Sequence, residues 1–587
     1  MIFFVFLYTV FMFIPPGENI IEKRKCTLSG EEFVITEKDA EFYDILAPTF
    51  WGEKFIIPFP TLCPRERQIR RMVWRNYDQL YKNTCALTGK EIVSTYKPWT
   101  PYKVASLDAW WSDSWNPCDY GREFDFSRPF FPQFYELDQA VIHMPSSVSK
   151  SENSTFTNFS INNRNCYLCF RVADCEDCYY SLLILRSKHC FDCYDVTDSE
   201  YLYECVHTLK SYHSLYCTNC ENCRDCYFLK DCFGCQDCFG SCNLRNARFV
   251  FNNKQLLELE YNTKKQQALQ NMHDLHQTRV DFIQSTVRFP KKFMTGYNNE
   301  NVVGDYLFSN KNIVFWFECK ESDNLRYGYG TVHTNDCIDF SFGYICEKSL
   351  EVCGVAGWYW QLFCVNNIND GINLIYCKDC VNTTSDSFGC ISLKKGKNCI
   401  FNMPYSQQEY ETSVVKIIKH MQSTGEWGEF FPAVHSPYDY NETSAQIHFP
   451  LSREEVVEKG LGWNEWEINE GNSGFTPLMI GEYDEKNVGY ERAKNNIDTI
   501  LKSTLSCKKT GKIFKILPQE LAFYIQNKLA IPTYHPTIRL TMRMWQTLPM
   551  ELHNRKCDEC WQAISTSYAP DRPEKILCEE CYRKLVY

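Results

Sequence analysis

The chain has 587 residues, with 62 basic and 73 acidic side chains, 44% hydrophobic residues and 33 cysteines. The hydrophobic content excludes global disorder, and the formal net charge of −11 argues against the overall basic field of a non-specific DNA-binding protein. An odd number of cysteines cannot all pair in internal disulfides, and their clustering favours reduced thiols with local metal sites over a secreted disulfide scaffold.

Residues 1–25 form an apolar leader that begins MIFFVFLYTVFMFI. The apolar run is shorter than the roughly 20 residues that a membrane-spanning helix needs. It also lacks the positive n-region and the small-residue cleavage site of a signal peptide. We therefore expect a cytoplasmic protein without a membrane partner. The alternative is an exported or membrane-anchored protein in which residues 1–14 are a true signal.

Residues 26–115 and residues 507–587 read as two copies of one module. The first copy contains Cys26-Thr-Leu-Ser-Gly, the second contains Cys507-Lys-Lys-Thr-Gly, and the match continues along both copies. The later matched pairs are Phe33 and Phe514, Arg67 and Arg539, Arg71 and Arg543, Cys85 and Cys557, and Tyr96 and Tyr568. We predict zinc-ribbon or treble-clef-like modules at both ends of the chain.

The second copy contains the spacing Cys-x2-Cys-x17-Cys-x2-Cys, which is typical of zinc ligands. These cysteines are Cys557, Cys560, Cys578 and Cys581. Four thiolates bind zinc tetrahedrally and leave no open position for catalysis, so we predict a structural zinc ion here. The alternatives are two disulfides or four free thiols. We expect the first copy to be free of metal. Of its four aligned positions, Cys85 keeps the cysteine, whereas Thr88, Ser106 and Ala109 lack it.

Arginines in both copies indicate a second kind of site. Four of them lie at i, i+3, i+4 and i+8 in PRERQIRRMVWRNY, and two more occupy matching positions in the second copy. The six are Arg67, Arg70, Arg71, Arg75, Arg539 and Arg543. On a helix they would form a basic face at which phosphate, RNA or DNA could dock. The alternative is that they pair with acidic side chains or pack on aromatic rings.

After a linker at 116–150, residues 151–253 have a 12-residue period. From Cys166 to Cys238 every gap between successive cysteines is 3, 6 or 12 residues. Small residues in fixed columns, beside an aromatic column, are typical of a β-solenoid in which each coil stacks on the one before. We expect columns one, four and seven, counted from residue 163, to point inward. The stacked aromatic column contains Tyr167, Tyr179, Phe191 and Tyr203.

Two consecutive coils of this predicted solenoid contain CxxC-x8-CxxC, close enough for one metal ion. These cysteines are Cys223, Cys226, Cys235 and Cys238. The competing interpretation is a ladder of buried free thiols, since free cysteine is among the most buried residue types. Labile redox disulfides are a third interpretation.

A weaker copy of the solenoid occupies residues 298–403. TSDSFGCISLKK at 384–395 superimposes on CQDCFGSCNLRN at 235–246, and each copy runs into charged, Gln-rich sequence that predicts a helix. We therefore expect a helical connector at 254–297. We also expect a helix followed by an extended aromatic and acidic segment at 404–506.

The expected fold is mainly β with α segments: two tandem short-coil β-solenoids, of about 12 residues per coil, flanked by the duplicated zinc modules. DCFGCQDCFGSCNLRN, GEWGEFFPAVHSPYDYNET and STSYAPDRPEKILCEECYRKLVY resemble the motifs of an uncharacterised family of Cys-rich, CxxC-containing predicted proteins from genomes of uncultivated small bacteria. The likeness covers most of the chain from Cys26 onward. It implies a bacterial cytoplasmic setting and supplies no activity.

The residues yield no catalytic set, because the histidines are scattered and Gly-rich phosphate motifs are absent. We therefore expect a non-enzymatic zinc-binding scaffold or interaction protein with a protein partner, since solenoids offer long flat faces for binding. One alternative is an RNA- or DNA-associated zinc-binding protein that uses the local arginine faces. Another is a carbohydrate-acting β-helix enzyme, which would need clustered carboxylates.

Overall fold

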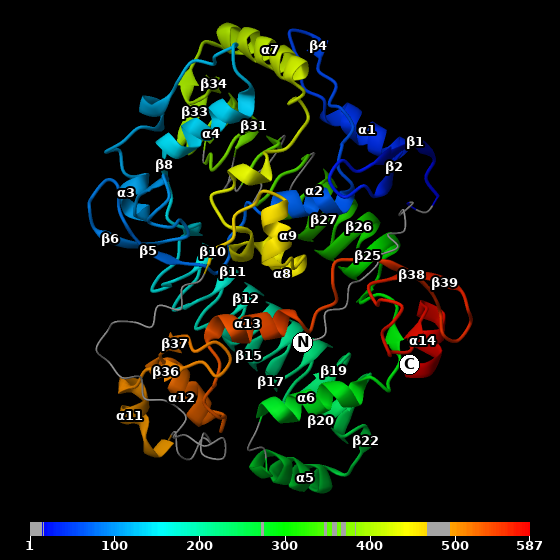
Figure 1. Cartoon of the computed structure of the whole chain (residues 1–587). Coiled ribbons are helices and arrows are strands. Elements are labelled where there is room, and N and C mark those ends of the chain that lie inside the picture. Colours follow the sequence, from blue (N-terminus) through cyan, green and yellow to red (C-terminus); the bar gives the residue numbers. More distant parts are fainter. Residues whose placement is uncertain are drawn as a thin grey trace.

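The computed structural model describes residues 17–271, 275–344, 349–354, 361–365, 371–381, 383–465 and 494–587, together with Pro15. Residues 1–14 of the predicted leader and residues 466–493 of the predicted segment 404–506 lie outside these ranges. The described part is mainly β with several helices (Figure 1). None of its helices combines the length and the apolar character that crossing a membrane requires.

The predicted β-solenoid of short coils is confirmed between residues 148 and 400. Strands of successive coils pair in parallel, with Phe170 opposite Leu182 and Leu182 opposite Tyr194, which is the 12-residue period of the sequence. The first stack of coils contains β9 (Val148–Ser149), β10 (Asn158–Ile161), β11 (Phe170–Ala173), β12 (Leu182–Leu185), β13 (Lys188–Phe191), β14 (Tyr194–Thr197), β15 (Glu200–Tyr203), β16 (Val206–Leu209), β17 (Tyr212–Leu215), β18 (Thr218–Glu221), β19 (Tyr227–Lys230), β20 (Gln236–Cys242), β21 (Arg248–Phe251) and β22 (Lys254–Gln255).

The coils are narrow because the backbone turns a corner at every third residue. Leu168, Arg171 and Asp174, for example, have φ values of 48°, 55° and 55°. This left-handed conformation costs most L-residues roughly 1–2 kcal/mol, and Asn and Asp tolerate it best, which explains their recurrence at the corners. Each 12-residue coil therefore has four sides of three residues.

One residue on each side of a coil points into the interior. Cys175, Cys178 and Ser181 are buried there, as predicted for columns one, four and seven. Column ten, with Ile184, also points inward, and the cysteine pattern did not reveal it because its first members are aliphatic. Interior thiols donate to carbonyls of the next coil; the Cys175 thiol lies 3.3 Å from the carbonyl oxygen of Ile184. Every described cysteine is a free thiol.

A second stack of coils follows two helices and is less regular. Glu300 pairs with Lys311 in a coil of 11 residues, and Leu362 pairs with Ile375 in a coil of 13, which explains the blurred columns of this half. Its strands are β24 (Gly296–Tyr297), β25 (Glu300–Phe308), β26 (Lys311–Lys320), β27 (Asp323–Val332), β28 (Asn335–Ile338), β29 (Ser341–Tyr344), β30 (Gln361–Leu362), β31 (Ile372–Ile375), β32 (Thr383–Phe388), β33 (Lys395–Lys397), β34 (Cys399–Ile400) and β35 (Met403–Pro404).

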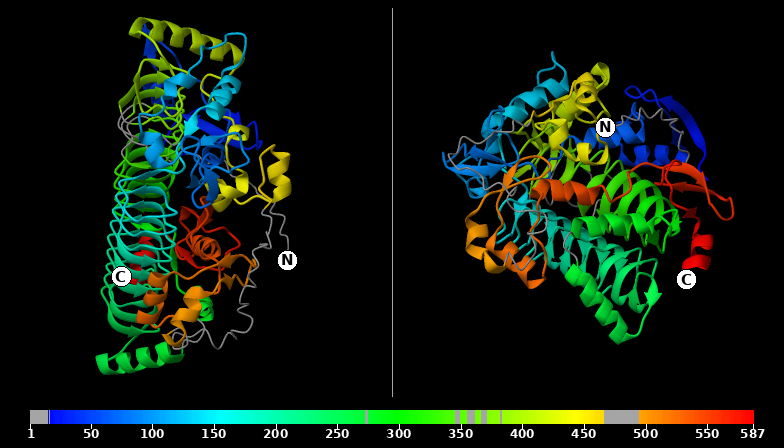
Figure 2. Two further views of the ribbon diagram at one scale, coloured as in Figure 1. Left: turned by 90° about the vertical axis from the view of Figure 1, so that its left-hand side faces the viewer. Right: turned by 60° about the horizontal axis from the view of Figure 1, so that its bottom comes forward.

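The two stacks lie side by side and run in opposite directions. The ring of His207 stacks on that of Tyr306 at 4.0 Å, whereas Tyr194, about one coil earlier in the first stack, donates to Glu318, about one coil later in the second. The helices predicted after each stack are present as α5 (Glu258–Asn271) and α7 (Gln407–Thr424). They lie at opposite ends of the column of coils (Figure 2).

The remaining elements belong to the two ends of the chain and to the connections. The N-terminal segment contains β1 (Ile20–Lys25), β2 (Glu32–Thr36), α1 (Glu37–Leu46), β3 (Thr49–Phe50), β4 (Glu53–Lys54), α2 (Pro64–Met72), β5 (Tyr81–Thr84), β6 (Glu91–Ser94), β7 (Lys103–Val104), α3 (Leu107–Trp111), η1 (Pro117–Tyr120), α4 (Phe130–Ala140) and β8 (Ile142–His143). The connections contain α6 (Leu275–Thr286), β23 (Lys291–Lys292), η2 (Ala433–His435), η3 (Tyr440–Glu442), α8 (Ser444–His448) and α9 (Arg453–Glu458). The C-terminal segment contains α11 (Ile497–Lys502), β36 (Leu505–Ser506), β37 (Ile513–Phe514), α12 (Pro518–Gln526), α13 (Pro536–Met544), β38 (His553–Lys556), β39 (Ala563–Thr566), β40 (Ile576–Leu577) and α14 (Glu579–Val586).

The N-terminal module docks on the second solenoid through two arginines of α2. Arg67 Nε and Arg71 Nη1 both donate to Asp339 Oδ1, at 2.9 and 3.2 Å. Arg71 Nη2 also donates to the carbonyl of Tyr327, one coil before Asp339, at 2.9 Å. The Tyr327 hydroxyl in turn donates to Asp39 in α1. The arginine side chains and the Asp339 carboxylate are buried.

The C-terminal module docks on the first solenoid through the matching contacts. Arg539 and Arg543 of α13 both donate to Asp192, and Arg543 Nη2 donates to the carbonyl of Tyr180, one coil earlier, at 2.8 Å. The Tyr180 hydroxyl donates to Glu520 in α12. Each module therefore packs on the solenoid that is distant from it in the sequence, with the same set of contacts.

The C-terminal module also covers the aromatic column of the first solenoid. Tyr179 and Phe191 stack with ring centroids 4.7 Å apart and planes 10° apart, as predicted for neighbouring coils. Phe523 of α12 stacks on Phe191 at 3.9 Å. Tyr203, one coil further, contacts the same Phe523 ring. The column is therefore a buried docking surface and not a solvent-exposed face.

The structure corrects the prediction that the arginines form basic faces for phosphate, RNA or DNA. The guanidinium-bearing side chains of five of them are at most 4% exposed: Arg67, Arg71, Arg75, Arg539 and Arg543. Arg70 is largely covered and lies between Glu351 and Glu429. Asp192, Asp339 and Glu351, which pair with these arginines, lie in coils far away in the sequence, so the local pattern of charges did not reveal them.

The docking contact predicts a large loss of stability on truncation of one arginine. Arg543→Ala should lower the free energy of unfolding by about 3–5 kcal/mol, because the Asp192 carboxylate stays buried without one of its two cations. Arg186→Ala, the control, removes a solvent-exposed pair with Asp198 and should cost less than about 1 kcal/mol. Chemical denaturation followed by circular dichroism measures both values. Equal losses would contradict the docking contact.

The solenoid interior predicts a contrast between two substitutions at one site. Cys178→Ser should be mildly destabilising, since a hydroxyl can donate to the same carbonyls, whereas Cys178→Arg should prevent folding because its charge has no partner inside the coil. Glu200→Lys, on an exposed outward position, should change stability by no more than about 0.5 kcal/mol. Thermal melts and the yield of soluble protein test this. A folded, stable Cys178→Arg variant would contradict the inward assignment.

Candidate metal centre

The first half of the metal centre is a tight hairpin turn between β38 and β39. The N–H of Cys557 donates to the carbonyl of Gln562 at 2.8 Å, and the N–H of Trp561 donates to the carbonyl of Cys557 at 3.0 Å. Trp561 has a φ of 65°, a left-handed conformation that closes the turn. The turn directs the thiols of Cys557 and Cys560 toward the start of α14.

The other two thiols come from the first turn of α14. Cys578 is the N-cap residue, and its N–H donates to Cys557 Sγ at 3.3 Å. The Sγ atoms of Cys557, Cys560, Cys578 and Cys581 all lie within 4.8 Å of one another, and those of Cys560 and Cys578 are 3.6 Å apart. Zinc–sulfur bonds of about 2.3 Å at tetrahedral angles place sulfurs about 3.8 Å apart. The four predicted ligands therefore form a cluster that could hold a metal ion.

Hydrogen bonds and burial shift the pKa values of these thiols in opposite directions. Burial acts to raise the pKa of Cys557, but hydrogen bonds from the backbone of Cys560, Cys578 and Glu559 outweigh it and lower that pKa to about 6. Burial and the neighbouring thiols raise the pKa of Cys581 to about 12. Four adjacent thiols cannot all ionise against their mutual repulsion, whereas a divalent cation stabilises four thiolates together.

Three other turns of the chain have the same hydrogen bonds as the turn at Cys557. After Cys26, Cys85 and Cys507, the N–H four residues later donates to the cysteine carbonyl, at 3.0, 2.9 and 2.9 Å. The donor in each is a glycine, with φ of 72°, 69° and 70°. Each turn faces the N-terminus of a helix: α2, α3 or α13. Each module thus consists of two similar halves.

The other three turns carry incomplete ligand sets. The facing groups are Cys26 with Ser29 and Cys63, Cys85 with Thr88 and Ser106, and Cys507 with Thr510 and His535. In the part of the chain that the structure describes, only the C-terminal four cysteines bring three or more potential ligand atoms within 4.8 Å of one another. The sequence reasoning missed Cys63 and His535. Each directly precedes a proline at the first position of a helix, which is a recognisable helix-start signal.

The weaker predicted metal set does not form such a cluster. It comprises Cys223, Cys226, Cys235 and Cys238, whose thiols line the solenoid interior. Cys223 Sγ donates to the carbonyl of Cys232 at 3.5 Å, and Cys226 Sγ to that of Cys235 at 3.6 Å. Neighbouring thiols of this set contact one another, but no three of the four bring their sulfur atoms within 4.8 Å of one another. All four thiols are buried and none is in a disulfide, as the ladder interpretation expects, and metal binding by this set stays a prediction.

No model of a known protein family matches the chain, and no curated protein matches its sequence. The chemistry of the metal centre therefore has to be argued from its own residues. The ligand atoms are all sulfur, and a set of four thiolates suits zinc better than magnesium or calcium, which prefer oxygen ligands.

The metal content of the protein should depend on the module half that contains Cys557 and Cys578, and not on the half that contains Cys507. Cys578→Ser should remove about one equivalent of metal per chain, because three thiols no longer close the coordination shell. Cys507→Ser, the matched change in an incomplete turn, should leave the metal content unchanged. Inductively coupled plasma mass spectrometry of the purified full-length variants measures both. Loss of metal from both variants, or from neither, would contradict the assignment.

Proposed function

We propose that the protein is a non-enzymatic zinc-binding scaffold with a protein partner. The observation that supports this best is the cluster of Cys557, Cys560, Cys578 and Cys581, since four thiolates fill a tetrahedral zinc shell. A filled shell leaves no position for a water molecule or a substrate. The zinc ion then stabilises a fold and does not take part in a reaction.

The turn-and-helix geometry supports a zinc-ribbon or treble-clef-like module. Two ligands come from a hairpin turn and two from the first turn of α14, and the β38–β39 hairpin supplies the connection. The other three module halves keep this geometry with one or two thiols each, and packing on the solenoids holds them in place. We propose that the zinc ion replaces part of that packing in the last module half, which contains Cys557 and α14.

The docking of both terminal modules on the solenoids supports the role of a scaffold. Buried ion pairs join α2 to the second solenoid and α13 to the first, so that the ends of the chain lock the two stacks of coils together. A frame of this kind presents fixed surfaces to a partner at little cost in conformational entropy. The free thiols of the described coils also fit a reducing compartment such as the cytoplasm.

Cobalt substitution tests the structural role of the metal. The Co²⁺-loaded full chain should show the visible absorption of a tetrahedral tetrathiolate centre. Added azide or cyanide should leave this spectrum unchanged, because a closed shell has no free position. Chelation should lower the melting temperature and make residues of α14 exchange their amide protons faster. A spectrum that shifts with azide would contradict a structural site and favour a catalytic one.

A further inference from the structure

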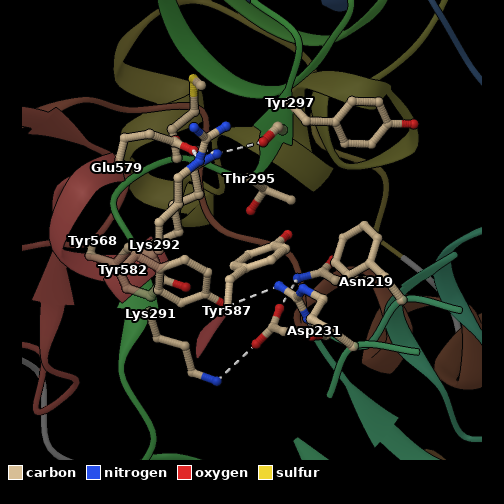
Figure 3. A pocket seen from close by; sticks show the side chains of 15 residues that line it. Asn219, Asp231, Lys291, Lys292, Thr295, Tyr297, Tyr568, Glu579, Tyr582 and Tyr587 are labelled. Carbon is tan, nitrogen blue, oxygen red and sulfur yellow. Dashed lines mark hydrogen bonds and ion pairs between the residues drawn. The ribbon is translucent and has the colours of Figure 1, made fainter. Parts of the chain in front are cut away.

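We propose that a cavity beside the metal centre is a nucleotide-binding site. The cavity has a volume of about 450 Å³, within the usual range for small-molecule sites. It lies between α14, the strands β23 and β24, and the last coils of the first solenoid. Figure 3 shows the side chains that line it.

Aromatic rings form much of the cavity wall. Tyr582 and Tyr587 come from α14 and the residue after it, Tyr568 comes from the loop after β39, and Tyr297 comes from the second solenoid (Figure 3). The rings of Tyr568 and Tyr582 are themselves well buried, so they are fixed before a ligand binds. Flat, fixed rings around a cavity of this size suit a planar heterocycle, which stacks on them.

Two buried polar atoms of lining residues have no hydrogen-bond partner. Asn219 donates its amide to Asp231 at 3.0 Å, and its Oδ1 accepts nothing. Arg245 donates through Nη1 to two carbonyls, and its Nε donates to nothing. Both atoms are buried and belong to side chains that line the cavity, one an acceptor and one a donor, and the edge of a nucleobase carries groups of both kinds.

The charges in the cavity leave an excess of positive charge. Four basic and two acidic side chains line it: Lys291, Lys292, Arg245, Arg583, Asp231 and Glu579. Glu579 is shared between Lys292 and Arg583, so it neutralises only one of them. An anionic group on the ligand would relieve this excess, and a phosphate supplies it.

Helix α14 connects this cavity to the metal centre. Cys578, the N-cap residue, and Cys581 lie within the first two turns of α14 together with Tyr582 and Arg583, and Tyr582 donates a hydrogen bond from its hydroxyl to Asn243 of the solenoid at 3.1 Å. Loss of the metal would release the start of α14 and with it one wall of the cavity. This coupling, unlike the cavity itself, rests on the proposed zinc ion.

Isothermal titration calorimetry of the metal-loaded full chain tests the site. AMP, GMP, CMP and UMP are titrated separately, and at least one should bind with a Kd below about 1 mM. Inorganic phosphate alone and the corresponding nucleoside alone should each bind at least about tenfold more weakly, since each engages only part of the cavity. Failure of all four nucleotides would overturn the inference. Equal binding of inorganic phosphate would also overturn it.

Two variants of α14 distinguish the effect of a cation that lines the cavity from the effect of the overall charge of the helix. Arg583→Ala removes an exposed cation that lines the cavity and should weaken nucleotide binding by about tenfold. Lys584→Ala removes an exposed cation of the next residue, outside the lining, and should change the affinity by less than about twofold. Equal effects of the two variants would overturn the site.

Removal of the metal distinguishes this inference from the proposed function. Chelator-treated protein should bind the nucleotide at least about tenfold more weakly than metal-loaded protein. Unchanged affinity after chelation would overturn the coupling through α14 and leave the cavity as a nucleotide site. A chain that binds the nucleotide but never contains metal would overturn the proposed zinc site instead.

Discussion

Two aspartates at corners of the coils, Asp192 and Asp339, connect the solenoids to the rest of the chain. Each has a left-handed backbone, with φ of 53° and 59°, and each accepts hydrogen bonds from two arginines of a docked helix. Removing two guanidinium groups and a carboxylate from water is costly unless their geometry satisfies all of them. The corner brings the carboxylate to both arginines, because it turns the side chain outward at a fixed place on the coil, although Asp339 Oδ2 and the Nε atoms of Arg539 and Arg543 are buried without a hydrogen-bond partner.

Each terminal module packs on the solenoid that is farther from it in the sequence. The order along the sequence is module, solenoid, solenoid, module, yet the N-terminal module packs on the second solenoid and the C-terminal module on the first. The matching contacts of Tyr327 and Tyr180 with acidic residues of α1 and α12 repeat this arrangement. The N-terminal module with the first solenoid therefore cannot separate from the second solenoid with the C-terminal module unless both docking contacts break. These contacts join the described modules and coils into one frame.

One turn-and-helix geometry recurs in all four module halves, although their potential metal ligands differ. Four turns share one hydrogen-bonding pattern, and one of the four has a complete set of thiols among the described residues. The turn at Cys85 keeps its shape with Ser106 in place of a ligand, and the N–H of Ser106 donates to Cys85 Sγ at 3.3 Å, as that of Cys578 does to Cys557. The backbone geometry that prepares a thiolate for a metal thus persists where the metal ligands are absent.

The sequence by itself determined the coil of the first solenoid and the four cysteines that cluster near the C-terminus. Both are short-range patterns: the inward columns repeat every 12 residues, and Cys557, Cys560, Cys578 and Cys581 lie within one hairpin and one helix turn. Only the tertiary structure decided the role of the arginines, because Arg71 and Asp339 are 268 residues apart and Arg543 and Asp192 are 351 apart. It likewise placed Cys223, Cys226, Cys235 and Cys238 in the solenoid interior, which their spacing alone did not establish. The physical reason is the same in both cases: a charge or a thiol takes its role from the groups that face it, and the docking of distant segments determines which groups those are.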